Sequence, residues 1–415
     1  MSPSPHYLAT HGGVGQVYYC PPTMSTKRLR EFNSAGTTYT LAEDLSYHNF
    51  FSAFDFFSGP DPTEGFVQYQ NYTSAIEQGL VGYLSDTQSV FLGVDHTSKN
   101  PNGRASVRLE SKKGWNKGLL VADIRHMPAS TCGSWPAYWL LGSHVEINGK
   151  ITWPDAGEID ILEGVNDYES NAVTLHTSTG CMIDNTTSPA TGSDSTPPPF
   201  TGFLKTDDCD VAAPDQRKNV GCSIAAPSAM TPSRPPSFKR GTASIDADIA
   251  FPSYGTSFNL ATGGVYAMEW TSASISVWFI PRVSPQFNTL FPAPASSTFL
   301  NTTLDVSALG TPIAHFAGQC DFEEKFKNLK IVFDTTFCGA WAGAEWESGG
   351  CAKKTGVATC EEYVRENPGV FAESYWEVAG LKWFQKDEVQ VNGYLPYVIP
   401  KVVRIWPPGP SGEES

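Results

Sequence analysis

The sequence has few basic residues and no long apolar run. Lys and Arg number 28 against 43 Asp and Glu, which gives a net charge of −15 at pH 7. Nucleic-acid binding needs clustered Lys and Arg, so this composition disfavours a polyanionic partner and favours an uncharged one. The longest apolar stretches, such as residues 117–124, are strand-sized and fall short of the roughly 18 residues of a membrane helix. We therefore expect a soluble protein with no nucleic-acid partner and no membrane span.

The first ten residues also lack the basic and then apolar pattern of a signal peptide. Three explanations stay open: the signal was removed, the gene model starts elsewhere, or the protein is intracellular. Nine cysteines favour secretion, and none stands in a CxxC pair or in a Cys/His spacing typical of zinc. We interpret them mainly as disulfides, with at least one left over in a monomer, and the alternative is buried free thiols. Sequons at Asn71, Asn185 and Asn301 allow glycosylation, so we predict an extracellular protein.

No repeat of fixed period is visible, and few segments have a helical period over three turns. Instead, from about residue 36, short segments rich in Val, Ile, Thr and aromatic residues alternate with Gly, Pro, Asn and Asp, as in residues 118–126 and 274–280. Only residues 73–80 and 360–368 indicate short helices. This pattern predicts an all-β fold, a β-jelly-roll sandwich of two antiparallel sheets with few short helices.

The domain organisation follows from composition. We expect an irregular N-terminal segment over residues 1–35, one β-sandwich domain over 36–395, and a tail over 396–415. Residues from about 182 to 238 are rich in Pro, Ser and Thr and poor in large aliphatic side chains. We predict that they form a long surface insertion, tied down by Cys181, Cys209 and Cys222.

Residues 157–164, GEIDILEG, place three carboxylates among three large aliphatic side chains. On a helix, positions two and five apart differ by about 200° and 140°, so the carboxylates would scatter. On a strand, Glu158 and Asp160 share a face and Glu163 falls on the other. One extra residue at 161 or 162, a β-bulge, brings Glu163 to the same face. We predict this bulge, with the aliphatic side chains in the core beneath.

Two glutamates flanking an aspartate on one face suit glycoside hydrolysis. A retaining glycosidase uses one carboxylate as the nucleophile and a second as the acid/base. Asp160 would orient the nucleophile by hydrogen bonds and raise the pKa of its neighbour through like-charge repulsion. The alternative is three solvated charges on an exposed strand face.

Tryptophans accompany this motif at positions 135, 139, 153 and 341. Aromatic rings stack on the C–H faces of sugars, although core packing is the alternative for each of them. Trp153 and Trp341 stand beside Pro and Gly in expected loops, where exposure is favoured, whereas the face of Trp139 is ambiguous.

Two further polar residues stand in predicted strands. His176 is a lone histidine, for which a structural role is the usual interpretation. Arg108 alternates with Val107 and Leu109 and so faces the polar side, where a surface ion pair is the alternative.

At this point the sequence resembles glycoside hydrolase family 16. That family is marked by Glu-x-Asp-x-x-Glu, matched by residues 158–163, and the form with the extra residue is typical of its laminarinase-like branch. The fungal endo-1,3(4)-β-glucanases are especially similar, and the likeness runs from about residue 38 to 385. The segments that carry it are residues 54–69, 118–128, 132–142, 157–166, 174–181 and 333–343.

The resemblance implies a β-jelly roll with a concave substrate cleft and a retaining double displacement. By motif match, Glu158 is the nucleophile, Asp160 the assisting carboxylate and Glu163 the acid/base. The resemblance also suggests five sugar contacts, which are His176, Arg108, Trp139, Trp153 and Trp341. Residues 143–152 and the 182–238 insertion are longer than usual for the family and could reshape the rim of the cleft.

The leading hypothesis is a secreted endo-β-glucanase that acts on 1,3-linked or mixed 1,3;1,4-linked β-glucans. A β-glucan transglycosylase and a non-catalytic glucan-binding lectin on the same fold are the alternatives, and the presence of both glutamates favours an enzyme. We expect a β-glucan as the partner, a monomer, and no cofactor. A structural calcium ion, present in some relatives, stays open.

Overall fold

The computed structural model describes residues 38–143, 153–184, 200–227, 252–291 and 303–386, which all lie in one compact unit, residues 37–415. The predicted N-terminal segment and C-terminal tail fall outside these ranges, as do the sequons at Asn185 and Asn301 and most of residues 143–152. Asn71, in the remaining sequon, is exposed. Its side chain caps a short helix by accepting a hydrogen bond from the Ser74 backbone N–H. Among the described residues, no helix has the length and apolar character to span a membrane.

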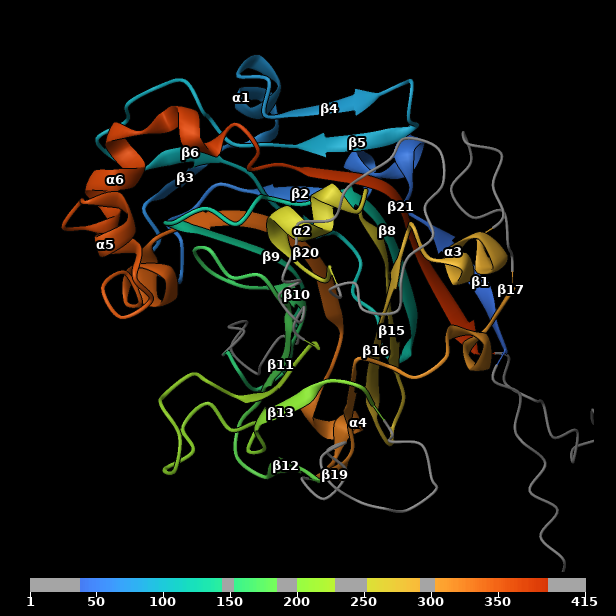
Figure 1. Cartoon of the computed structure of the whole chain (residues 1–415). Coiled ribbons are helices and arrows are strands. Elements are labelled where there is room, and N and C mark those ends of the chain that lie inside the picture. Colours follow the sequence, from blue (N-terminus) through green and yellow to red (C-terminus); the bar gives the residue numbers. More distant parts are fainter. Residues whose placement is uncertain (1–37, 144–152, 185–199, 228–251, 292–302, 387–415) are drawn as a thin grey trace, which may run out of the picture. The chain divides into compact units, whose positions relative to one another are not determined.

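Two large antiparallel sheets dominate this part of the chain (Figure 1). The eight-stranded sheet has the order β13-β14-β11-β10-β9-β20-β7-β2. Its strands are β2 (Phe54–Phe57), β7 (Arg108–Ser111), β9 (Ser134–Gly142), β10 (Glu158–Glu163), β11 (Ala172–His176), β13 (Phe203–Thr206), β14 (Cys222–Ala225) and β20 (Leu329–Phe337).

The nine-stranded sheet has the order β17-β1-β21-β8-β15-β16-β18, and the hairpin β4-β5 joins it at β21. Its strands are β1 (Thr38–Asp44), β4 (Val81–Leu84), β5 (Ser89–Leu92), β8 (Gly118–His126), β15 (Gly264–Trp270), β16 (Ile275–Pro281), β17 (Thr303–Asp305), β18 (Ala314–Phe316) and β21 (Trp376–Lys386). Two small pairs complete the described strands: β3 (Val67–Tyr69) with β6 (Arg104–Ser106), and β12 (Cys181–Ile183) with β19 (Gly318–Cys320).

The helices are short. The α-helices are α1 (Tyr72–Glu77), α2 (Gly255–Leu260), α3 (Pro285–Leu290), α4 (Phe322–Lys325), α5 (Cys351–Thr355) and α6 (Cys360–Glu366). Single turns of other helix types are η1 (Tyr47–Asn49), η2 (Phe51–Ala53), η4 (Val306–Leu309), η6 (Pro368–Phe371) and the π-helix η5 (Gly339–Gly343). Helices α1 and α6 lie in the two segments where the sequence indicated them, and the jelly-roll prediction is confirmed.

The two sheets differ in how their outer faces are covered. Strand β8 is buried along most of its length, because Leu120 and Ala122 face the main core whereas Leu119 and Val121 face a second apolar cluster. That second cluster includes Phe287 of α3 and closes the outer face of the nine-stranded sheet. In the eight-stranded sheet, the positions that alternate with the core residues include polar and aromatic side chains, such as Arg108, Trp139 and Asp334. We call this second set of positions the site face.

The predicted insertion is only partly an insertion. Residues 203–206 and 222–225 form β13 and β14, which extend the eight-stranded sheet beyond β11. The sequence prediction was wrong for this part because the segment contributes only two short strands, whose inward-facing residues, such as Ile224, are too few to stand out in a Pro-rich region. The other described parts, among them the loop around Cys209, lie outside the strands.

Eight of the nine cysteines form disulfides, and Cys20 lies outside the described residues. The pairs are Cys132–Cys351, Cys181–Cys320, Cys209–Cys222 and Cys338–Cys360. The prediction that the cysteines serve mainly as disulfides is therefore confirmed.

Candidate active site

The candidate active-site residues cross the site face in the order of the strands. His176 lies on β11, the three carboxylates on β10, Trp139 on β9 and Arg108 on β7. Their immediate neighbours in the sequence, such as Leu175, Leu140 and Leu109, point into the main core instead. Successive side chains of a strand point to opposite faces of the sheet, so each of these strands contributes alternate residues to the core and to the site face.

The bulge predicted in β10 is present. Asp160 pairs with Thr174 and Glu163 with Ala172 on β11, so three steps on β10 match two on its neighbour. Against β9, Asp160 pairs with Trp139 and Glu163 with Ala137, with the same extra residue between them. Both carboxylates therefore lie on the site face, while Ile159, Ile161 and Leu162 are fully buried beneath.

Asn171 supports this bulge from the start of β11. Its side-chain NH2 donates to the Ile161 carbonyl (2.7 Å), and its Oδ1 accepts from the Glu163 backbone N–H (2.9 Å). The extra residue in a bulge leaves ladder groups without a strand partner. The fully buried Asn171 amide satisfies two such groups and fixes the direction of Glu163.

Glu158 lies beside an indole donor and an imidazole. The Trp153 indole N–H donates to Oε2 of Glu158 (2.7 Å), and Nε2 of His176 lies 3.9 Å from its Oε1. The same His176 nitrogen lies 3.1 Å from Oδ2 of Asp160, so the imidazole stands against both carboxylates. Trp153 is 41% exposed, and its ring centroid is 6.0 Å from that of His176, as expected of a residue at the rim of a site.

Glu163 has a different environment. The Trp135 indole N–H donates to its Oε1 (2.8 Å), and the edge of the Trp135 ring meets Trp341 with centroids 5.6 Å apart. Burial is the main cause that raises the pKa of Glu163 well above its usual range, and the negative charge of Asp160 adds to it.

The pKa values of the other two carboxylates, Glu158 and Asp160, are also raised. Burial, and then the charge of Asp160, raises the pKa of Glu158 to about 7, against the opposing effects of His176 and the Trp153 hydrogen bond. Burial and the charge of Asp334 raise the pKa of Asp160 well above its usual range. Glu158 and Glu163 differ in their neighbours, because Glu158 has the Trp153 indole donor and the His176 imidazole beside it, whereas Glu163 accepts from Trp135.

Arg108 lies deeper than a surface ion pair would. It is only 4% exposed, its guanidinium pairs with Glu110 at 2.9 Å, and it stacks over Trp139 and Phe57 at 5.0 and 4.9 Å. Trp139 is half-buried on the site face, which settles the ambiguity of its orientation.

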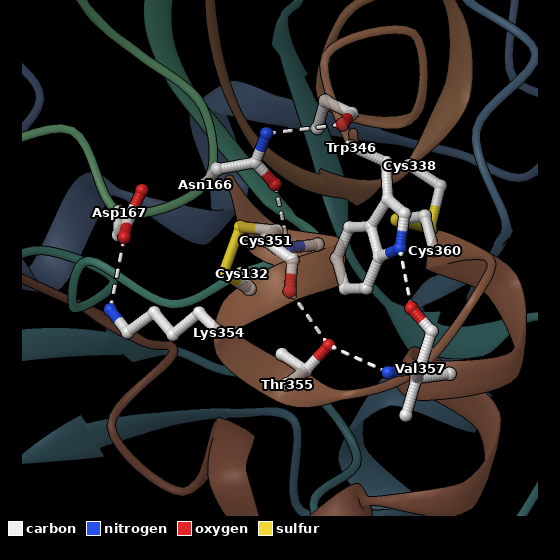
Figure 2. The surroundings of a disulfide bond; sticks show 12 residues. Cys132, Asn166, Asp167, Cys338, Trp346, Cys351, Lys354, Thr355, Val357 and Cys360 are labelled. Atoms are coloured by element: carbon white, nitrogen blue, oxygen red, sulfur yellow. Dashed lines mark hydrogen bonds and ion pairs between the residues drawn. A yellow bond between two sulfur atoms is a disulfide. The ribbon is translucent and has the colours of Figure 1, made fainter. Parts of the chain in front are cut away.

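The segment that carries Trp341 is flanked by two disulfides, Cys132–Cys351 and Cys338–Cys360, which Figure 2 shows. Trp341 lies in the π-helix η5, between Cys338 and Cys351, which pair with Cys360 and Cys132. Asn166, three residues after Glu163, accepts from the Gly133 amide and donates to the Ala342 carbonyl. The backbones that carry Trp135, Glu163 and Trp341 are thus linked at one end of the site.

Sequence reasoning missed several residues of this face. Trp135 was noted without a role, while Asp334, Tyr69 and Asn171 were not considered. Asp334 could have been noticed in the sequence, since it alternates with Ile331 and Phe333, which are apolar residues of the same strand. The roles of Tyr69 and Asn171 depend on contacts between strands that are distant in the sequence.

Two groups in the described ranges place three potential metal ligands within 4.8 Å of one another. Cys132 and Cys351 of the first group are joined in a disulfide, so they offer no thiolate. The second group is Glu158, Asp160 and His176, which are two of the candidate catalytic carboxylates and one predicted sugar contact. The expectation of no cofactor stays a prediction.

Comparison with known proteins identifies the family. Residues 54–234 and 237–384 match the model of the XgeA-like catalytic GH16 domain. The chain belongs to glycoside hydrolase family 16. An endo-1,3(4)-β-glucanase of Arthroderma benhamiae is 39% identical over 363 residues, which are 86% of this chain and 67% of that protein. A probable endo-1,3(4)-β-glucanase of Aspergillus flavus is 36% identical over 92% of this chain, which spans only 49% of that relative.

Solved structures of family 16 share the fold. An elongating β-1,3-glucosyltransferase matches with a TM-score of 0.66 and 38% identity, over 84% of this chain and 100% of the other. Laminarinase 16A of Phanerochaete chrysosporium, with 6-O-glucosyl-laminaritriose in its donor and acceptor sites, matches with the same score and coverage and 34% identity. The family inferred from the motifs is therefore confirmed.

Proposed function

We propose that this family 16 domain is a retaining endo-β-glucanase for 1,3-linked or mixed 1,3;1,4-linked β-glucans. The observation that carries the proposal is the bulged strand β10, which places Glu158, Asp160 and Glu163 on one face in unequal surroundings. A double displacement needs one carboxylate that ionises readily and another that keeps a proton. The names of the relatives support a β-glucan as the substrate.

Each group has a role in this mechanism. Glu158, ionised and oriented by Trp153, attacks the anomeric carbon while Glu163 transfers its proton to the leaving oxygen. A glycosyl ester to Glu158 forms, and the aglycone departs as an alcohol. Glu163, now a base, takes a proton from water as its oxygen attacks the same carbon, which frees Glu158. Asp160, held against His176, orients the nucleophile.

Aromatic and basic side chains on either side of β10 offer contacts to the sugar chain. Two of these side chains, Trp153 and His176, lie near the nucleophile. Trp139 and Arg108 stack on each other on β9 and β7, and Trp341 lies near the acid/base. Ring faces suit the C–H faces of an uncharged sugar chain, and the charge of Arg108 is already paired with Glu110. We also propose that the protein acts outside the cell, because four disulfides suit an oxidising compartment.

Product analysis tests this proposal. On laminarin, lichenan and barley β-glucan, we expect reducing ends to accumulate on at least one polymer, with short oligosaccharides early in the reaction. Proton NMR of the first products should show the β-anomer before mutarotation, because two displacements restore the configuration. An α-anomer formed first would exclude retention, and no product from any of the three polymers would exclude a β-glucanase.

Trp135→Phe tests the assignment of Glu163. The Trp135 hydrogen bond lowers the pKa of Glu163, so its loss should raise that pKa further. If Glu163 is the proton donor, the alkaline limb of the kcat/KM profile moves to higher pH, and the acid limb stays in place. Trp346→Phe, in which a buried indole N–H loses a bond to the Val357 carbonyl, serves as the matched control. An unchanged alkaline limb in Trp135→Phe would contradict the assignment.

Transglycosylation is the second candidate, and one observation favours it. The glucosyltransferase structure is 38% identical to this chain, a similar level of identity to that of the curated glucanases. The chemistry would be the same until a sugar hydroxyl replaces water in the second step. Mass spectra of a laminari-oligosaccharide reaction decide between them, because only transfer yields chains longer than the donor.

A further inference from the structure

Asp334 lies on the site face of β20, two strands from the catalytic carboxylates. It pairs across the sheet with Arg108 on β7 and with Ala137 on β9. Oδ1 accepts a hydrogen bond from the Trp139 indole (3.3 Å), and Oδ2 accepts one from the Tyr69 hydroxyl (3.0 Å). The residue is only 7% exposed. Its backbone carbonyl accepts from the buried Trp376 indole (3.1 Å), which fixes the strand from the core side.

Charged groups approach Asp334 from several elements. Arg108, which is itself paired with Glu110, contributes positive charge from β7. Asp61 contributes negative charge from the loop after β2, and Asp160 does so from β10. Tyr69 and Trp139 supply neutral donors, from β3 and β9.

We infer that Asp334 is a positioning residue, which fixes Trp139 against the sugar chain and couples the Trp139–Arg108 pair electrostatically to Asp160. The inference rests on the proposed function, because it assigns the residue to the same site. Asp334 itself contacts the neighbouring side chains and acts through them.

The donor geometry explains why this position suits a carboxylate. An indole N–H can only donate, and the Tyr69 hydroxyl donates to the second oxygen, so both partners converge on an acceptor-only group. An asparagine offers one acceptor oxygen and one NH2, so one of the two bonds must reverse or break. The negative charge of Asp334 also favours the guanidinium of Arg108, which stacks over Phe57 and Trp139.

The charge of Asp334 provides a specific readout. Burial raises the pKa of Asp334 to about 7, although the neighbouring Arg108 opposes the rise. Asp334 in turn raises the pKa of Asp160, and Asp160 raises the pKa of Glu163. Removal of one negative charge makes the remaining carboxylates easier to ionise, so the activity profile should move to lower pH.

The test compares Asp334→Asn and Tyr69→Phe on the β-glucan that the enzyme hydrolyses. Asp334→Asn should lower kcat/KM about tenfold and displace the pH profile downward by about one unit. Tyr69→Phe should raise KM about threefold and move the profile much less than Asp334→Asn does, because it removes a hydrogen bond that lowers the pKa of Asp334 but leaves the charge of Asp334 in place. Asp123→Asn, a buried aspartate on β8 that pairs with Arg282, is the matched control and should leave the profile unchanged.

An NMR measurement separates this inference from the proposed function. The indole N–H signal of Trp139, assigned with Trp139→Phe, should titrate near pH 7 in the parent and lose that titration in Asp334→Asn. If no glucan is hydrolysed, the proposed function fails and the NMR titration alone decides the inference. An active Asp334→Asn with parental KM, kcat and pH profile would overturn it, as would a Trp139 signal that does not respond to the substitution. If Asp334→Asn does not fold, Tyr69→Phe and the parental titration still decide it.

Discussion

Glu163→Ala and Glu158→Ala are each expected to lower kcat/KM on a β-glucan by about 10²–10⁴-fold or more, the range for loss of a general acid or base. In the proposed mechanism Glu163 is the proton donor and Glu158 the nucleophile, and each accepts a hydrogen bond from an indole, Trp135 and Trp153 respectively. The measurement is initial-rate release of reducing ends. Glu323→Ala, which removes an exposed glutamate paired with Lys117, is the control and should retain parental activity.

Rescue by azide distinguishes the nucleophile from the acid/base. With Glu158→Ala, azide should replace the missing nucleophile and yield an α-glycosyl azide from an activated β-glycoside. With Glu163→Ala, the ester on Glu158 still forms, and azide should give the β-glycosyl azide. The opposite products would exchange the roles, and parental activity in either variant would remove that residue from the mechanism.

Glu158→Gln should also be inactive and should stabilise the fold, so unfolding would not explain the inactivity of this variant. The folded-state pKa of about 7 lies above the usual 4.5, so the folded protein binds more protons than the unfolded chain between these values. The free energy of unfolding therefore falls as pH rises from about 4.5 to 7. Glutamine has no charge to bury, so the Tm of Glu158→Gln should exceed the parental Tm at pH 8, and the difference should shrink towards pH 4.5.

The face of each catalytic carboxylate could be predicted from the sequence. Strand alternation placed Glu158 and Asp160 on one face. Glu163 reaches the same face only if the strand has a bulge, and β10 has one. Arg108 was placed on the polar face by the same reasoning, since Val107 and Leu109 beside it are apolar. A period of two is a local property, and short windows of sequence contain it completely.

The supporting residues could not be predicted in this way. Asn171 completes the bulge, and Tyr69 reaches Asp334 across 265 positions of sequence. Such contacts depend on which strands become neighbours, and alternation within one strand carries no information about that order. The disulfide pairing has the same limit, because Cys132 joins Cys351 over a separation of 219 residues.

Removing the Cys132–Cys351 disulfide should cause the largest loss of stability among the four. In the chain-entropy treatment, a closed loop of 219 residues contributes up to about 5 kcal/mol to the free energy of unfolding, whereas the 13-residue separation of Cys209–Cys222 contributes about 3 kcal/mol. The double variant Cys132→Ser/Cys351→Ser should therefore lower Tm more than Cys209→Ser/Cys222→Ser does, measured by thermal denaturation under identical conditions.

The same two double variants distinguish a loss of overall stability, measured as Tm, from a change in the candidate active site, measured as KM. Cys132 lies three residues before Trp135, and Cys351 follows the π-helix that carries Trp341, so the long-loop disulfide joins the segments that carry these two rings. Well below its Tm, the long-loop variant should have a higher KM for a long glucan, while the short-loop variant keeps the parental KM. Equal KM values in folded samples would mean that Cys338–Cys360 and the Asn166 hydrogen bonds hold these segments without the Cys132–Cys351 bond.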